Sequence, residues 1–234
     1  LLNYGSNGTA LDKATGRVAW TTGKGGRSFN VPVVASVKDE PTVLFFATNA
    51  VVALDLKNGS EQWRVPFGEG YFCHSADPVL GGDAVYVGSA DHGGQVIRFA
   101  EGRPETLWKG RQLGNFMASS IVRDGYLYGI NLTDAKPAQA ELKCLDFKTG
   151  EVKWTEPGFG WGSFILAGDR LVLLSDKGEL SVAKASPEKF ELLARFQVIG
   201  GKCWTPPTLA NGRLFVRNAA GDLVCFEVSP GRAD

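Results

Sequence analysis

The chain has 234 residues, of which 44% are hydrophobic, so it can bury a sizeable core and is not expected to be disordered. Its 25 Lys and Arg residues balance its 25 Asp and Glu residues. Without net charge, no whole-molecule field attracts nucleic acid or an anionic membrane, and nucleic acid is not an expected partner. The 30 glycines interrupt apolar runs of at most about six residues, which excludes a transmembrane helix and indicates many short strands.

Short strands joined by tight turns are predicted along the whole chain. Five similar stretches begin with a brief apolar segment, at 31–34, 77–80, 119–122, 163–166 and 205–209. In four of them a Gly, Asp or Asn turn follows, at 81–83, 124–125, 168–169 and 211–212. Such dipeptides are typical of β-hairpins. Two further turns then lead into a third and a fourth strand.

A recurring tryptophan marks the predicted fourth strand. Trp20, Trp63, Trp108 and Trp154 recur at spacings of 43, 45 and 46 residues, and Phe196 takes the corresponding place in the next repeat. Three of these tryptophans stand four residues after a glycine in one shared pattern, at 10–20, 53–63 and 144–154. In that pattern an Asp side chain can bond the backbone two residues on, and Gly supplies the positive φ of a turn.

Four antiparallel strands in each repeat of this length predict an all-β fold, a β-propeller of four-stranded blades. No sustained 3.6-residue spacing supports a helical repeat. We expect one propeller domain over 1–234, with a partial blade at 1–20, blades at 31–66, 77–110, 118–156 and 162–198, and a last incomplete blade at 204–228. An open arc would expose sheet faces. We therefore expect absent upstream blades, with closure by oligomerisation or a composite blade as the alternatives.

The repeated Ala-Leu-Asp-x-x-[Thr/Asn]-Gly-x-x-x-Trp pattern resembles the repeat of the PQQ-like (pyrroloquinoline-quinone-type) propeller family. The resemblance covers essentially the whole chain, although 99–105 and 183–189 lack the Asp turn. It implies a propeller of seven or eight blades in which Trp20, Trp63, Trp108 and Trp154 dock one blade on the next. The family includes calcium-dependent quinoprotein dehydrogenases, the propeller lipoprotein of the outer-membrane β-barrel assembly machinery, and many non-catalytic extracytoplasmic propellers. The resemblance implies a periplasmic or cell-envelope localisation.

A second aromatic series precedes the first strand of each repeat: Phe29, Phe72, Phe116, Trp161 and Trp204. Because the first strand of a blade lines the central channel, these rings are predicted to form an arc around one mouth of the channel. The arc could bind a planar ligand or a segment of a partner. A position that is aromatic in every blade also fits packing between blades.

Other candidates belong to loops on the same face. His74 and His92, with Cys73, Asp77 and Asp91 nearby in sequence, could form a metal or acid–base cluster, but the absence of a close His/Cys pair favours structural or solvated residues. The loop 131–140, which contains Asp134, is longer than its counterparts, so it is a candidate for partner contact or a functionless insertion. Cys144 and Cys225 replace small residues of the repeat, and no disulfide is expected.

These features predict a non-catalytic scaffold without a cofactor, with another protein, or else a small planar ligand, as its partner. The alternative is a PQQ- and Ca²⁺-dependent alcohol or sugar dehydrogenase, or a fragment of one. That chemistry needs oxygen ligands for Ca²⁺, a carboxylate base and a sandwich over the quinone. The sequence offers no convincing set of such residues, so no catalytic or metal-binding residue is predicted.

Overall fold

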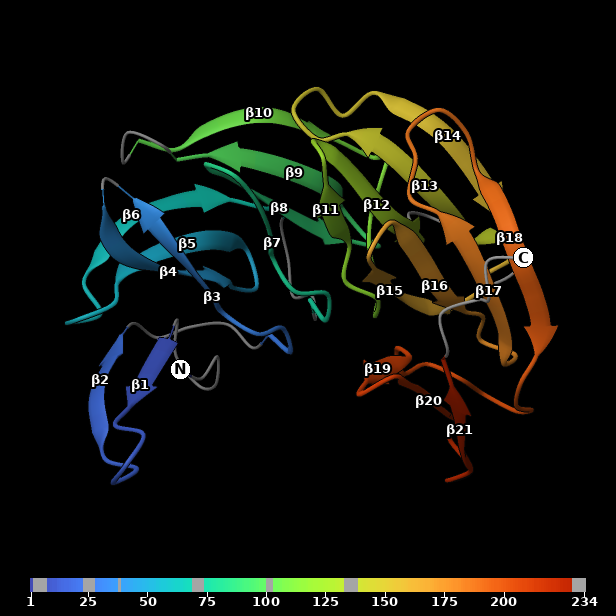
Figure 1. Ribbon diagram of the computed structural model, residues 1–234. Coiled ribbons are helices and arrows are strands. Elements are labelled where there is room, and N and C mark those ends of the chain that lie inside the picture. Colours follow the sequence, from blue (N-terminus) through green and yellow to red (C-terminus); the bar gives the residue numbers. More distant parts are fainter. Residues whose placement is uncertain are drawn as a thin grey trace.

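The described part of the chain is an arc of β-sheets. The computed structural model describes residues 1, 8–22, 28–37, 39–68, 74–99, 103–132 and 139–228. These residues form six antiparallel sheets. Among them there is no helix with the length and apolar character that crossing a membrane requires. Figure 1 shows the sheets side by side in an open arc, with the N-terminal and C-terminal sheets at its two ends. The chain is therefore all-β, with four-stranded antiparallel sheets as the repeat predicts.

Four of the sheets have four strands each, joined in chain order as hairpins. Their strands are β3 (Val33–Val37), β4 (Glu40–Phe46), β5 (Ala50–Asp55), β6 (Glu61–Pro66), β7 (Val79–Gly81), β8 (Ala84–Ser89), β9 (Gly93–Arg98), β10 (Glu105–Gly110), β11 (Ile121–Arg123), β12 (Tyr126–Asn131), β13 (Glu141–Asp146), β14 (Val152–Pro157), β15 (Ser163–Ala167), β16 (Arg170–Leu174), β17 (Glu179–Lys184) and β18 (Glu191–Gln197). The N-terminal sheet contains β1 (Gly8–Leu11) and β2 (Val18–Thr22). The C-terminal sheet contains β19 (Thr208–Ala210), β20 (Arg213–Arg217) and β21 (Leu223–Glu227).

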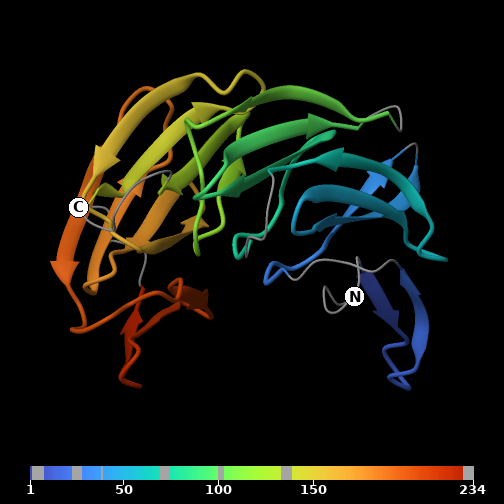
Figure 2. The ribbon, with the colours of Figure 1, turned by 180° about the vertical axis from the view of Figure 1, so that it is seen from behind.

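The first strand of each four-stranded sheet lies on the inner side of the arc, and the fourth lies on the outer side (Figure 1). Figure 2 shows the same order from behind. Along the inner side, β7 contacts both β3 and β11. The loops that lead into the first strands and the loops between second and third strands therefore open on one face of the arc, as in a propeller blade.

The turns have the backbone that their residues favour. Asp124 and Gly125 have φ values of 50° and 81°, as a type I′ hairpin turn requires. In the turn between β13 and β14, Asp146 Oδ1 accepts hydrogen bonds from the backbone N–H groups of Lys148 (3.0 Å) and Thr149 (2.8 Å). Asp12 is the equivalent residue in the first sheet, and its carboxylate accepts hydrogen bonds from the hydroxyl and the backbone N–H of Thr15. These bonds hold the pKa of Asp12 below its usual value. These bonds lie within single turns, so they stabilise the hairpins independently of packing between sheets.

The core lies between successive sheets rather than within one of them. Side chains alternate along β4, so that Val43 and Phe45 pack toward Trp20 of the preceding sheet. Leu44 and Phe46 point the other way, into a cluster shared with β8 and β9 of the following sheet. The same two-sided burial recurs in later sheets. Each four-stranded sheet is therefore stabilised by both neighbours, and the loops at its ends are held on a rigid base.

Candidate functional site

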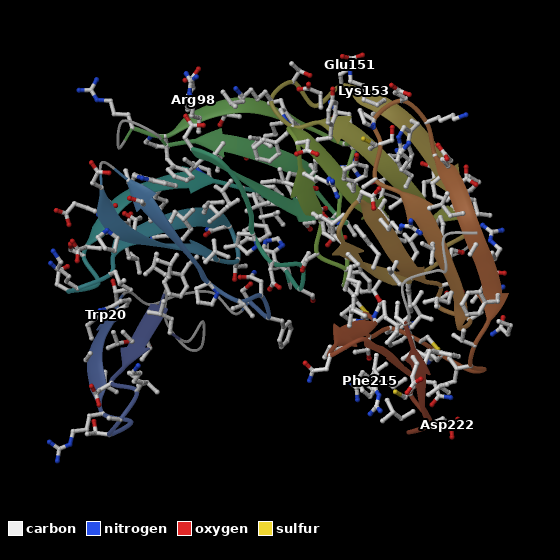
Figure 3. The ribbon with its side chains drawn as sticks, in the orientation of Figure 1. Trp20, Arg98, Glu151, Lys153, Phe215 and Asp222 are labelled. Atoms are coloured by element: carbon white, nitrogen blue, oxygen red, sulfur yellow. The ribbon has the colours of Figure 1, made fainter. Side chains whose placement is uncertain are left out.

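The tryptophans of the fourth strands, here called the docking tryptophans (Trp20, Trp63, Trp108 and Trp154), reach toward the next sheet. The indole N–H of Trp20 donates to the Leu56 carbonyl (3.0 Å). The corresponding bonds run from Trp108 to the Phe147 carbonyl (2.9 Å) and from Trp154 to the Ser186 carbonyl (2.8 Å). In Figure 3, Trp20 lies at the end of its sheet that faces the rest of the arc. Trp63 is buried, and the corresponding turn at 100–102 lies outside the described residues.

The glycine of the repeated pattern supports the tryptophan of the preceding sheet. A Cβ atom on Gly59 would come within 2.5 Å of the Trp20 ring, and one on Gly150 within 2.7 Å of the Trp108 ring. Both glycines also have positive φ, 74° and 72°. Glycine is thus required twice, for the turn and for the close approach of the ring. Within one copy of the pattern, the Gly contacts the preceding sheet, whereas the Trp four residues later contacts the following sheet.

The second aromatic series brings three of its members together. Phe116, Trp161 and Trp204, here called the aromatic row, come from three successive loops that lead into first strands. The ring centroids of Phe116 and Trp161 are 5.6 Å apart, and those of Trp161 and Trp204 are 5.0 Å apart. All three rings are half-buried. Phe29 is 71% exposed, and its backbone N–H donates to the His74 carbonyl (2.9 Å). Phe72 lies outside the described residues.

The loops that carry Trp161 and Trp204 are fastened to Asp176, in the turn between β16 and β17. The backbone N–H of Asp176 donates to the Phe159 carbonyl (3.3 Å), and its carbonyl accepts from the Cys203 N–H (3.0 Å). Its carboxylate lies against Gly160, where a Cβ would come within 2.4 Å of it. The two tryptophans are therefore held by one turn that sequence spacing did not single out. The only signal for this turn in the sequence is its expected position on the same face as the loops that carry Trp161 and Trp204.

The loop that carries Phe116 is fastened to the end of β12. The backbone N–H of Gly114 donates to Asn131 Oδ1 (2.8 Å), and the Leu132 N–H donates to the Gly114 carbonyl (2.8 Å). Leu132 also helps to line an apolar crevice beside Phe116 and Trp161. The loop 131–140 therefore leaves the sheet next to the aromatic row, although Asp134 itself lies outside the described residues.

A cation stands at one end of the aromatic row. The Lys202 ammonium lies 4.5 Å from the centroid of the Trp204 ring. The Lys202 side chain is exposed, and its carbonyl accepts from the Ala219 N–H (2.8 Å), which ties the loop to the last sheet. Lys202 is not among the residues predicted from the sequence, although its place two residues before Trp204 is a usable signal for a cation–π contact.

The two histidines converge on one phenylalanine. His74 is buried, stacks on Phe46 with 4.0 Å between centroids, and places its Nε2 2.8 Å from the Thr48 carbonyl oxygen. Both His74 and His92 meet Phe67 edge to face, at 5.5 Å and 6.2 Å. Burial lowers the pKa of His74, which favours the neutral ring. His74 is thus placed as a packing residue at the junction of two sheets.

The remaining candidates are spread apart in the described residues. No group of three or more His, Cys, Asp and Glu side chains comes together there in a way that could hold a metal ion. Asp77 links neighbouring loops: its Oδ1 accepts from the Val31 N–H (2.7 Å) and its N–H donates to Ser119 Oγ (3.0 Å). Cys144 is a buried free thiol, and burial raises its pKa to about 11. Cys73 lies outside the described part of the chain.

Comparison with known proteins identifies relatives of this repeat. The sequence profile of the family described as outer membrane protein assembly factor BamB matches residues 2–156. Outer membrane protein assembly factor BamB of Yersinia pestis is 24% identical over 238 residues, which cover 95% of this chain and 57% of that protein. The chain thus spans less than two thirds of the length of that relative.

Solved structures share the arrangement of sheets. BamB from Moraxella catarrhalis matches with a TM-score of 0.51 at 17% identity, over 94% of this chain and 78% of that one. A quinohemoprotein alcohol dehydrogenase from Pseudomonas putida matches with a TM-score of 0.62 at 13% identity, over 91% and 44%. Such low identities show the fold and carry no activity. Because the family profile matches well over half of its residues, the chain belongs to the PQQ-like repeat family described as outer membrane protein assembly factor BamB.

Proposed function

We propose that this chain is a non-catalytic scaffold of the bacterial cell envelope, on the periplasmic side, which holds another protein during outer-membrane protein assembly. Its family and its relative in Yersinia pestis support the assembly role. The observation that carries the binding role is the aromatic row, in which Phe116, Trp161 and Trp204 touch one another on the face where the loops open.

The row has the properties of a protein-binding surface. Tryptophan bound in a partner's pocket supplies a large part of the affinity of many interfaces. The loops of the row are fixed by backbone hydrogen bonds to Asp176 and to the end of β12, so little ordering free energy is lost on binding. Leu132, the last described residue before residue 139 in this loop, lies beside the row and belongs to the same proposed surface.

A quinoprotein dehydrogenase fits the described residues poorly. These residues bring together no group of three or more metal-ligating side chains, and the rings of the row are tilted by 47° and 65° rather than parallel. If the scaffold proposal is right, PQQ and Ca²⁺ together leave the melting temperature unchanged. A saturable shift that requires both would contradict it, because a ligand at 100 times its Kd stabilises by about 2.7 kcal/mol.

The scaffold proposal is tested in a strain that lacks the gene. We expect the wild-type protein to restore the amount of folded outer-membrane β-barrel proteins, and the double variant Trp161→Ala, Trp204→Ala to accumulate without restoring it. A matched control changes Lys148, an exposed residue in a turn at the opposite end of its blade, to Ala. Normal outer-membrane proteins in the strain without the gene would refute the assembly role.

A further inference from the structure

The aromatic row favours some ligands over others because its rings contact each other. A planar ligand held between two rings needs parallel faces roughly 7 Å apart, twice the usual contact distance. Here the neighbouring centroids are only 5.6 Å and 5.0 Å apart, and the ring planes are tilted by 47° and 65°. The row therefore presents a continuous apolar strip of ring faces and edges. An extended peptide fits such a strip, because its alternate side chains point the same way about 7 Å apart.

The strip ends at a positive charge. Lys202 lies over Trp204 and is exposed, and within the described ranges it forms no ion pair with a carboxylate. The carboxylates on the same face make other contacts. Asp222 Oδ2 accepts from Asn218 Nδ2 (2.7 Å), and the Asp176 carboxylate lies beside Gly160; within the described residues neither carboxylate pairs with Lys202. An incoming carboxylate would therefore meet the Lys202 ammonium without displacing an internal partner.

The charges elsewhere on the arc are arranged differently. Glu151 and Lys153 pair at 2.8 Å at the start of the fourth strand β14, and Arg98, at the end of the third strand β9, pairs with Glu105 of the fourth strand β10. Figure 3 shows Arg98, Glu151 and Lys153 along the outer side of the arc, where their charges are balanced. The positive end of the aromatic row thus differs from the neutralised outer side and gives the row a direction.

We propose that the aromatic row and Lys202 together bind an extended acidic segment of a partner protein, with apolar or aromatic side chains on the rings and a carboxylate on the Lys202 ammonium. This inference rests on the proposed function, because it specifies the partner of the same surface. The rings supply apolar contact, and the ammonium sets the register and excludes basic segments, as rim charges do in protein interfaces.

The proposal is tested with dye-labelled octapeptides and the full chain, by fluorescence anisotropy. The acidic probe carries two phenylalanines at alternate positions followed by two aspartates. A second probe carries lysines in place of the aspartates, and a third carries alanines in place of the phenylalanines. We expect the acidic aromatic probe to bind most tightly. Lys202→Glu should weaken it by about tenfold or more and reverse the preference for the acidic over the basic probe. Lys148→Glu, the matched control, should change neither.

Three results with these peptides would overturn the proposal. The first is no binding of the acidic aromatic probe, the second is equal binding of the acidic and basic probes, and the third is binding that survives Trp161→Ala with Trp204→Ala. Circular dichroism of each variant shows that it is folded. Tight binding of a planar quinone that depends on the row would also contradict a peptide partner.

The cellular assay separates this inference from the proposed function. If both hold, Lys202→Glu lowers the amount of folded outer-membrane proteins as the double tryptophan variant does, while Lys148→Glu does not. If the tryptophans are required but Lys202→Glu restores outer-membrane proteins fully, the scaffold role stands and the acidic segment is wrong. If both variants restore the outer-membrane proteins fully, the aromatic row is not the binding face.

Discussion

The two aromatic series of this chain share a repeat length but have different surroundings. Trp108, a docking tryptophan, is 8% exposed, donates to the Phe147 carbonyl and rests on Gly150 of the next sheet. Trp161 and Trp204 are half-buried and contact each other, and Trp161 also contacts Phe116 and packs against the core cluster between its neighbouring sheets. Aromatic residues that recur with the same period therefore need not have the same surroundings. One series joins neighbouring sheets, and the half-buried members of the other lie in the loops at the sheet ends.

The largest expected effect comes from removing a docking tryptophan. Trp108→Ala leaves a cavity between two sheets and an unpaired Phe147 carbonyl, so it should lower the free energy of unfolding by about 3–5 kcal/mol. Urea unfolding followed by circular dichroism measures this loss. Trp204→Ala is the matched variant from the aromatic row and should cost no more than about 2 kcal/mol. Equal losses would contradict the division into two series.

A glycine pair isolates the contact between sheets. Gly150 and Gly16 occupy the same position of the same turn, with φ of 72° and 71°. A Cβ on Gly150 meets the Trp108 ring, whereas one on Gly16 meets nothing within 4 Å. Both Gly→Ala variants should lose roughly 1–2 kcal/mol for the left-handed backbone. Gly150→Ala should lose a further 1–3 kcal/mol or so, and this excess should disappear in a Trp108→Ala background.

Thiol labelling reports on the packing around another docking tryptophan. Cys144 lies opposite Trp154 in the β13–β14 register, and burial raises its pKa to about 11. In a variant that keeps only Cys144, we expect labelling at pH 8 to be slow, because only about one thiol in a thousand is ionised. Trp154→Ala should speed the labelling severalfold, and Trp204→Ala should not. A variant that keeps only the exposed Cys225 provides the fast reference.

The smallest effect concerns His74, which is in an inter-sheet loop but is buried like a docking residue. Because burial lowers its pKa in the folded chain, the unfolded chain binds more protons as the pH falls through the ordinary histidine range. The stability that His74 contributes is therefore present above about pH 6.5 and decreases as the pH falls below it. Urea midpoints at pH 7.5 and 5.5 should differ less for His74→Gln than for the wild type. An equal difference would show that His74 is not the responsible group.

The fold could be predicted from sequence to the extent that it depends on local chemistry. Turn residues such as Asp124 and Gly125 determine where strands meet, and the Asp–Gly turns close their hairpins through bonds within a few residues. The all-β class and the four-stranded sheets follow from these signals. The contact of Gly150 with Trp108 could not be predicted, because it depends on how one sheet is placed on the next.

The candidate site was only partly predictable for the same reason. Spacing alone placed Phe116, Trp161 and Trp204 in one series, and the structure brings these three into contact. It could not identify Asp176, because that residue acts through backbone bonds to two loops from other parts of the chain. Lys202 was missed because a single exposed lysine is ordinary until an aromatic face is found beneath it.

The most direct test of the account is the amount of folded outer-membrane β-barrel proteins in a strain that lacks the gene and carries the Trp161→Ala, Trp204→Ala variant. We expect the variant to accumulate as a folded protein to wild-type levels, while the outer-membrane proteins remain as depleted as without the gene. Full restoration of the outer-membrane proteins by this variant would contradict the claim that the aromatic row is the binding face.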